Sequence, residues 1–223
     1  MTREMIAPLL FGIVGVAILL NLGAWQLRRL EWKNDMIATI EARMHEPPVS
    51  VPAHPEPDQD RFRHIRSSGE IRPGELHVYT SVPPYGVGYR IVVPFELQNG
   101  RVILLDRGFV PIEEKDKARH LGPIMIEGAL QWPRETDRFT AEPDLDANIW
   151  FARDVPLMAE TLQTEPVLLV TEASDDPGQP MPLPVAVNIR NNHLEYAITW
   201  FSLAFVWAVM TLYLLSRIKR RTE

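Results

Sequence analysis

The chain contains no cysteine among its 223 residues. This absence excludes disulfides, thiol catalysis and metal sites built from thiolates, including copper handling through cysteine. The sequence also shows no internal repeat, no phosphate-binding glycine loop and no zinc or calcium motif. The acidic residues Glu113, Glu114 and Asp116 have the pattern of a charged loop, and no paired-carboxylate site is evident. The sequence therefore offers no nucleophile–base pair or metal cluster with which to build an enzyme.

Two long apolar runs stand near the two ends of the chain. The run from Tyr196 to Leu215 has 20 residues without a charge. At about 1.5 Å per residue, that length crosses a hydrocarbon core of roughly 30 Å. The run from Ile6 to Trp25 is equally long, and a cleaved signal peptide is its alternative interpretation. Only Arg3 is basic before it and no small-residue cleavage site follows, so we predict transmembrane helices at residues 6–25 and 196–215.

Charge is distributed unevenly along the chain. Acidic residues outnumber basic ones between Asn34 and Arg190, which argues against nucleic acid as a partner. Basic residues follow the second span and predict a cytoplasmic tail over residues 216–223. Both termini are then cytoplasmic and residues 46–190 are exported. We expect a bacterial inner membrane with a periplasmic middle domain, since no presequence precedes the first span. The basic residues Arg28, Arg29 and Lys33 break the charge rule, because they would lie at the outer face.

The middle of the chain reads as β structure after a long first helix. Apolar residues at helical spacing, from Leu30 to Met44, predict that this helix continues to about residue 45, before Pro47 and Pro48. A proline-rich linker follows to Asp60. Alternation then predicts six strands: Phe62–Ile71, Leu76–Val82, Tyr89–Leu97, Val102–Phe109, Ile124–Leu130 and Val167–Glu172.

Local signals refine this prediction. The segment 98–101, Gln-Asn-Gly-Arg, is a strong hairpin signal. A short helix is expected over Val155–Leu162, with Asp154 as its N-cap. We therefore expect two transmembrane helices that flank a small antiparallel sheet or barrel, rather than a parallel α/β fold.

A polar motif immediately precedes the second span. His193 lies one helical turn before the apolar run, beside Asn191 and Asn192. An imidazole at this depth is either a hydrogen-bonded interfacial group or a metal or heme ligand, and the residues alone leave both possibilities open. His193, Trp200 and Trp207 share one helical stripe, and the alternative role for the two tryptophans is to face lipid. Small residues on both spans predict that the helices pack together: Gly12, Gly15, Gly23, Ala197, Ala204 and Ala208.

Two further segments carry candidate residues. The segment 25–33 is either an interfacial belt or a guanidinium pair, Arg28 and Arg29, for carboxylates or propionates. In the segment 106–111, we expect Asp106 and Arg107 to pair at a strand end and Gly108 to adopt a backbone geometry closed to other residues. The remaining histidines lack ligand spacing and are expected to be solvated: His45, His54, His64, His77 and His120.

Three segments together resemble the surfeit locus protein 1 family: residues 22–33, 106–111 and 191–201. The resemblance covers almost the whole chain and implies a non-enzymatic assembly factor of heme-copper cytochrome c oxidase. Such a protein binds heme a and assists its insertion into the large catalytic subunit, and heme a synthase is a second candidate partner. The alternatives are a cofactor-free membrane scaffold that stabilises an oxidase assembly intermediate, and a membrane-tethered enzyme.

The resemblance also implies roles for single residues. His193 becomes the ligand of the heme iron. Around it we expect a cofactor-binding set that includes Trp25, Arg28, Arg29, Tyr196 and Trp200, with the two arginines on the heme propionates. Arg107 and Gly108 remain structural.

Overall fold

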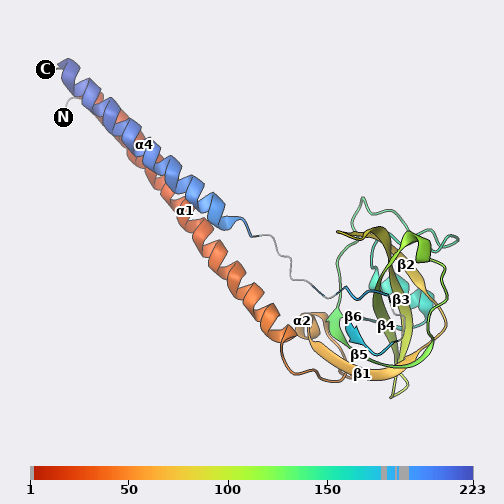
Figure 1. Ribbon diagram of the computed structural model, residues 1–223. Helices are drawn as coiled ribbons and strands as arrows, with labels where there is room; N and C mark the ends of the chain where they lie inside the picture. Colours follow the sequence, from red (N-terminus) through yellow and green to blue (C-terminus); the bar gives the residue numbers. More distant parts are fainter. Residues whose placement is uncertain (1–2, 177–179, 184, 186–190, 223) are drawn as a thin grey trace. The chain divides into compact units, whose positions relative to one another are not determined.

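The computed structural model describes residues 3–176, 180–183, 185 and 191–222. It divides the chain into two compact units, one formed by Met1–Thr39 with Val187–Glu223 and the other by Ile40–Ala186. The predicted domain limit at Arg190 and the predicted end of the tail at Glu223 lie outside the described residues. Figure 1 traces the chain through both units.

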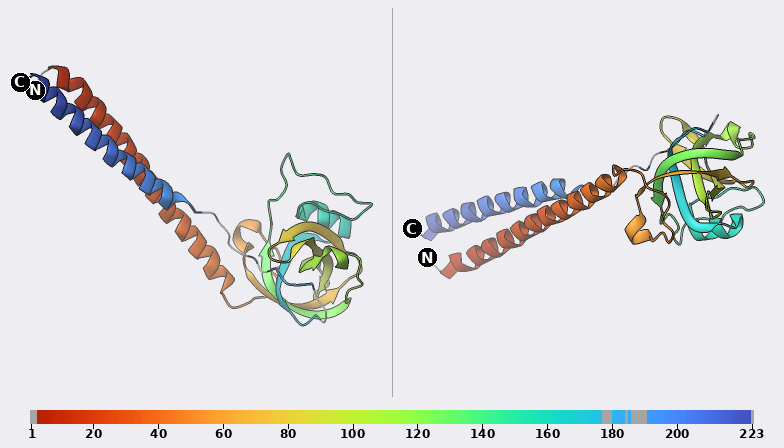
Figure 2. Two further views of the ribbon diagram at one scale, coloured as in Figure 1. Left: turned by 45° about the horizontal axis from the view of Figure 1, so that its top comes forward. Right: turned by 90° about the horizontal axis from the view of Figure 1, so that it is seen from below.

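Two long helices make up the first unit. Helix α1 spans Arg3–Met44 and helix α4 spans His193–Thr222. Each contains an apolar stretch long enough to cross a membrane. The two helices run antiparallel and side by side, with the start of α1 beside the end of α4 (Figures 1 and 2). The chain is thus a two-span membrane protein, and the predicted extension of the first helix past the apolar run is confirmed.

The second unit is a small β domain. Its strands are β1 (His64–Ile71), β2 (Leu76–Val82), β3 (Gly86–Leu97), β4 (Val102–Pro111), β5 (Gly122–Gln131) and β6 (Glu165–Ser174). They follow the order β1-β5-β6-β4-β3-β2, and an additional β1–β3 pairing closes the sheet into a barrel (Figure 2). All six predicted strands are present, and the hairpin at residues 98–101 joins β3 to β4.

One strand pair differs from the prediction. β4 and β6 run parallel, whereas the other pairs in the barrel are antiparallel. Helix α3 (Val155–Leu162) precedes β6 and reverses the chain so that β6 enters beside β4 in the same direction. The α3 prediction is confirmed, including its cap: the Asp154 carboxylate accepts a hydrogen bond of 3.1 Å from the Leu157 amide. The predicted linker also contains a short helix, α2 (Pro57–Asp60).

The central strands are buried on both faces. In β4, Ile103 and Leu105 belong to the barrel interior, together with Phe95 of β3. Leu104, which points to the opposite face, packs in a second cluster with Trp150 and α3. Two apolar environments therefore require a continuous apolar run in β4 rather than an alternating one. A 3-10 turn, η1 (Ile112–Glu114), follows this strand.

The segment around Gly108 lies within β4 rather than at a strand end as predicted. The β3–β4 register skips Arg107, since Ile91 faces Gly108 and Val92 faces Asp106. This bulge holds Gly108 at φ +120°, and a Cβ there would collide with the Met181 carbonyl. The predicted need for glycine is confirmed, because both the backbone angle and the space exclude a side chain.

The predicted pairing of Asp106 with Arg107 is wrong. Asp106 is fully buried and accepts a 2.6 Å hydrogen bond from Arg90 of β3. Arg107 instead donates to Asp176, at 2.5 Å, in a pair that is almost completely buried. The two neighbouring side chains therefore have different partners, and each partner lies on another segment of the chain.

Candidate functional site

The seam between the two membrane helices is built from small residues on α1 and aromatic residues on α4. Gly23 faces the Phe201 ring, whose nearest atom lies 2.7 Å from where a Cβ would stand. Gly15 lies against Trp207 in the same way, with the Phe11 ring 5.3 Å from that of Trp207. The predicted packing of the helices is therefore confirmed, whereas the lipid-facing alternative for Trp207 is wrong.

The seam ends in two polar bridges between the helices. A 2.7 Å hydrogen bond joins the His193 Nδ1 to the side-chain oxygen of Gln26. Nearby, the side-chain Nδ2 of Asn191 donates a hydrogen bond of 2.9 Å to the side-chain oxygen of Asn34. Gln26 is only 8% exposed and His193 is half-buried. Within the described part of the chain, the His193 Nε2 makes no hydrogen bond, so this nitrogen is available to a ligand.

Gln26 and Asn34 were missed by sequence reasoning. Gln26 lies three residues after Gly23, on the stripe of α1 that faces α4, and it is a polar residue on that stripe. The signal was therefore present as a polar side chain on a small-residue face. It could not be used, because only the antiparallel pairing of the helices reveals that position 26 meets position 193.

Two of the other predicted cofactor residues, Trp25 and Arg28, lie on one flank of α1. Trp25 and Arg28 line a shallow hollow of about 520 Å³ on α1, together with Val14, Ala17, Ile18, Asn21 and Leu22. All seven lining residues belong to α1, and this flank differs from the face that meets α4. A role of Trp25 and Arg28 in binding a cofactor therefore stays a prediction. The helical period rotates positions 25 and 28 away from position 26.

Three further candidates lie close to the same end of the helix pair. The Arg29 guanidinium lies 4.0 Å from the centre of the Trp32 ring. This cation–π contact is typical of the interfacial belt that was the alternative interpretation for this segment. On α4, Trp200 is half-buried and Tyr196 is 55% exposed. The exposed side chain of Tyr196 is thus accessible to a ligand or a partner.

The β domain contains buried charges, but they are satisfied by one another. Asp106 accepts from Arg90 and from the Gly108 amide. Arg153 lies 3.5 Å from Asp106 and also binds Glu135. Burial acts to raise the pKa of Glu135, but the hydrogen bond and charge of Arg153 more than offset it and hold that pKa below its ordinary value. This network therefore links β3 and β4 to the segments that carry Glu135 and Arg153.

His77 departs from the expectation that the scattered histidines are solvated. It is buried, and its Nε2 lies 2.6 Å from the Glu75 carboxylate, which also binds Arg119. His77 lies at the start of β2 beside Tyr89, with the two ring centres 5.9 Å apart. The alternation pattern placed His77 in a strand, but it could not reveal that Glu75, its partner, also binds Arg119, 44 residues further along the chain.

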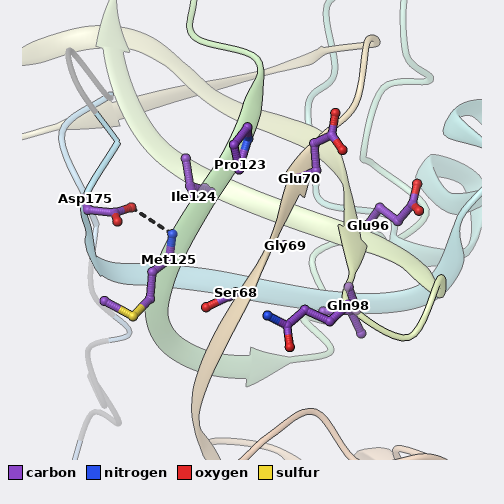
Figure 3. A pocket seen from close by; sticks show the side chains of 10 residues that line it. Ser68, Gly69, Glu70, Glu96, Gln98, Pro123, Ile124, Met125 and Asp175 are labelled. Carbon is purple, nitrogen blue, oxygen red and sulfur yellow. Dashed lines mark hydrogen bonds between the residues drawn. The ribbon is translucent and has the colours of Figure 1, made fainter.

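A hollow of about 500 Å³ opens where β1 meets β3 and β5 (Figure 3). Its acidic residues are Glu70, Glu96 and Asp175. Arg72 binds both glutamates, and Asp175 accepts a 2.7 Å hydrogen bond from the Met125 amide. Throughout the described ranges, no group of three or more histidine or acidic side chains is arranged to hold a metal ion. The structure therefore directs attention to His193 rather than to the β domain.

Arginines shift the pKa values of two surface carboxylates of the β domain. The hydrogen bond from Arg66 lowers the pKa of Glu127. Arg101 lowers that of Glu165 in the same way. Glu172 behaves oppositely, because burial raises its pKa. These shifts describe the pH dependence of the domain rather than a catalytic group.

Two membrane helices closed by a histidine–glutamine bridge, with a β barrel between them in sequence, define a two-span membrane protein whose candidate site lies on the helices. A model of the SURF1 family matches residues 13–205, and the chain belongs to this family. It is a family of cytochrome c oxidase assembly factors rather than of catalysts, which confirms the resemblance stated above.

Individual relatives show how far the similarity extends. The chain is 29% identical over 214 residues to Surfeit locus protein 1 of Rattus norvegicus, covering 84% of this chain and 70% of the rat protein. It is 31% identical over 208 residues to Surfeit locus protein 1 of Homo sapiens, covering 82% and 69%. A SURF1-like protein of Rickettsia felis is 28% identical over 217 residues, covering 92% of this chain and 94% of the relative.

Proposed function

We propose that this protein carries heme a as cargo during the assembly of cytochrome c oxidase and that the His193 Nε2 ligates the heme iron. One observation carries the proposal. His193 is a half-buried imidazole at the polar end of the helix seam, with Nδ1 bonded to Gln26 and Nε2 without a hydrogen bond from any described residue. A neutral imidazole that offers one nitrogen is the usual protein ligand of heme iron.

The surroundings of His193 fit an apolar macrocycle with a polar edge. Ala197, one turn further along α4, is buried in the helix seam, and Trp200 is half-buried and adds an aromatic surface. Tyr196 is exposed on the same end of α4. Arg28 and Arg29 supply guanidinium groups near this end of α1, and we propose that they neutralise the heme propionates.

The proposed location is a bacterial inner membrane, with both termini in the cytoplasm and the β domain in the periplasm. The basic residues after the second apolar run support this orientation. The partner that receives heme a is then the large subunit of the oxidase, and heme a synthase is the source from which it would be loaded. Nothing in the acidic middle domain favours nucleic acid.

Replacing the imidazole tests the ligand assignment. His193→Ala protein, purified in detergent from cells that make heme a, should lack the Soret absorption that the wild-type protein carries. His54→Ala is the matched control, since His54 is an exposed histidine of the β domain, and it should retain the absorption. Equal heme content in the His193→Ala and wild-type proteins would show that His193 is not the ligand.

The same purification separates a heme carrier from a cofactor-free scaffold. A scaffold should show no Soret band when it is purified free of the large oxidase subunit, even from cells rich in heme a. A carrier should show the Soret band when it is purified without the large subunit.

The role of the two arginines is tested separately. Replacing Arg28 and Arg29 together with glutamine should lower heme occupancy while protease added from outside still reaches the β domain. Normal occupancy with a changed protease pattern would instead assign them to membrane orientation.

A further inference from the structure

The hydrogen bond between Gln26 and His193 determines more than the pairing of two helices. The atom of Gln26 that meets the imidazole is its side-chain oxygen, 2.7 Å from Nδ1. A carboxamide oxygen only accepts hydrogen bonds, so Nδ1 must carry the proton and donate it. A neutral imidazole protonated at Nδ1 keeps its lone pair on Nε2. The bond therefore selects one of the two neutral tautomers of His193.

We propose that Gln26 is a positioning residue for His193: it holds the imidazole in the Nδ1–H tautomer and so presents the Nε2 lone pair to an incoming iron. This inference rests on the proposed function and adds a residue on the opposite helix to the site. A hydrogen bond to the far nitrogen of a ligating histidine orients the ring and raises its basicity. Gln26 is 8% exposed, so water competes little for its oxygen.

The position of the bond links ligand strength to helix pairing. Gln26 lies on α1 and His193 lies on α4, 167 residues apart in the sequence. Just beyond Gln26, the contact of Gly23 with Phe201 sets the spacing between the helices. If the helices separate, the hydrogen bond between Gln26 and His193 breaks. The imidazole can then exchange tautomers and rotate. The affinity of His193 for iron then falls without any change in the ligand itself.

A second bridge at the same end of the seam provides a matched control. Asn34 accepts a 2.9 Å hydrogen bond from Asn191 and does not touch the imidazole. If Gln26 acts only by joining the helices, loss of the Asn34 bridge should have a similar effect on His193. If Gln26 acts on the tautomer, Asn34→Leu should leave the state of the imidazole unchanged.

The tautomer is measured first, in full-length protein without heme. Nitrogen-15 spectra of histidine-labelled protein in detergent, with His193 assigned by comparison with His193→Ala, should show a protonated Nδ1 and an unprotonated Nε2. Gln26→Leu should give a mixture of tautomers, whereas Gln26→Glu and Asn34→Leu should retain the wild-type state. A wild-type imidazole protonated at Nε2, or an unchanged spectrum in Gln26→Leu, would overturn the proposal.

Heme a binding to the same variants is measured second. Loss of a hydrogen-bond partner behind a ligand lowers metal affinity by about 10–100-fold, so Gln26→Leu should bind heme a at least about tenfold more weakly. Gln26→Glu, which keeps an acceptor, should bind within about threefold of the wild type and lower the midpoint potential of the bound heme. If heme a binding weakens equally in Gln26→Leu and Asn34→Leu, Gln26 acts only by joining the helices, and the proposal is overturned.

The two measurements separate this inference from the proposed function. If the wild-type protein shows the Nδ1–H tautomer but binds no heme a, the proposed cargo is wrong and the action of Gln26 on His193 stands. If heme a binds through His193 and Gln26→Leu changes neither the spectrum nor the affinity, the role of Gln26 alone is wrong.

Discussion

The β domain and the helix pair both bury polar side chains, but they satisfy them in different ways. In the barrel, Asp106 and Arg107 are buried as ions, each held by an oppositely charged partner. In the helix pair, both bridges join neutral groups. Gln26 is buried and bonds the His193 imidazole, whereas the bridge from Asn34 is exposed. Removing one member of a buried ion pair leaves an uncompensated charge, whereas a broken neutral hydrogen bond costs much less.

This difference suggests a division of labour within one chain. The barrel is closed, and buried ion pairs join its strands to one another and to the following segment, so separating them is costly. The helix pair relies on small residues, aromatic contacts and two neutral bridges, so its two halves can part at moderate cost. The carrier role proposed above needs the second kind of interface near the site, because the cargo must be released. The predictions below test this contrast, from the largest expected effect to the smallest.

The largest effect is expected at the bulge of β4. Gly108→Glu should remove most of the folded protein from the membrane, with a destabilisation above about 4 kcal/mol, because the new side chain meets the Met181 backbone at a positive φ. Gly122→Glu is the control, since Gly122 has φ +108° with nothing near its missing Cβ. It should cost about 1–3 kcal/mol. Protein abundance and thermal unfolding in detergent measure both, and equal stability would show that the backbone angle alone matters.

The buried ion pair is expected to rank second. Arg107→Leu leaves Asp176 charged and almost fully buried, and should destabilise the β domain by about 3–5 kcal/mol. Arg66→Leu removes an exposed partner of Glu127 and should cost about 0–1 kcal/mol. The double variant Arg107→Leu/Asp176→Leu should recover much of the loss. If the double variant is no more stable than Arg107→Leu, the lost packing of the side chain rather than the orphaned charge is responsible.

The helix seam should show a smaller effect on stability and a clearer effect on cargo. Ala204 is buried between the helices, and Ala204→Leu should overpack the seam by about 1–3 kcal/mol and reduce heme retention. Val206→Leu adds bulk on an exposed face of α4 and should change neither quantity. Heme content after detergent washing provides the measurement. If Ala204→Leu keeps all of its heme, the spacing of the helices does not control heme binding.

Crosslinking tests the register of the same seam directly, because the chain has no native thiol. The structure places Gly15 against Trp207 and Gly12 against Thr211. Cysteines at positions 12 and 211 should therefore join on mild oxidation, whereas cysteines at 12 and 201 should not.

The smallest effect concerns pH. The pKa values of Glu127 and Glu165 are lowered in the folded domain by Arg66 and Arg101. Their contribution to stability is present above the unfolded glutamate pKa of about 4.3 and is lost as the pH falls through the lower folded values. Both groups are partly exposed, so the loss should be modest. The thermal midpoint of the β domain should fall between pH 5 and pH 3, and less so in Glu165→Gln. An equal fall in that variant would assign the acid sensitivity to other carboxylates.

Several features follow from short stretches of sequence alone. The hairpin at 98–101, the cap at Asp154, the limits of α3 and the demand for glycine at position 108 all depend on turn chemistry or periodicity within about ten residues. The two apolar spans depend only on length and composition. These signals act locally, so no knowledge of the rest of the chain was needed to use them.

Other features were decided only by the tertiary structure. Arg107 finds Asp176, 69 residues away, because β6 enters parallel to β4 and brings the following segment beside the bulge. His193 bonds Gln26, 167 residues away, because the antiparallel helices bring positions 26 and 193 to the same height along the pair. A sequence with many arginines, acids and amides allows many such pairings. Which of them forms is a matter of chain topology, since a hydrogen bond selects its partner by position in space rather than by distance along the chain.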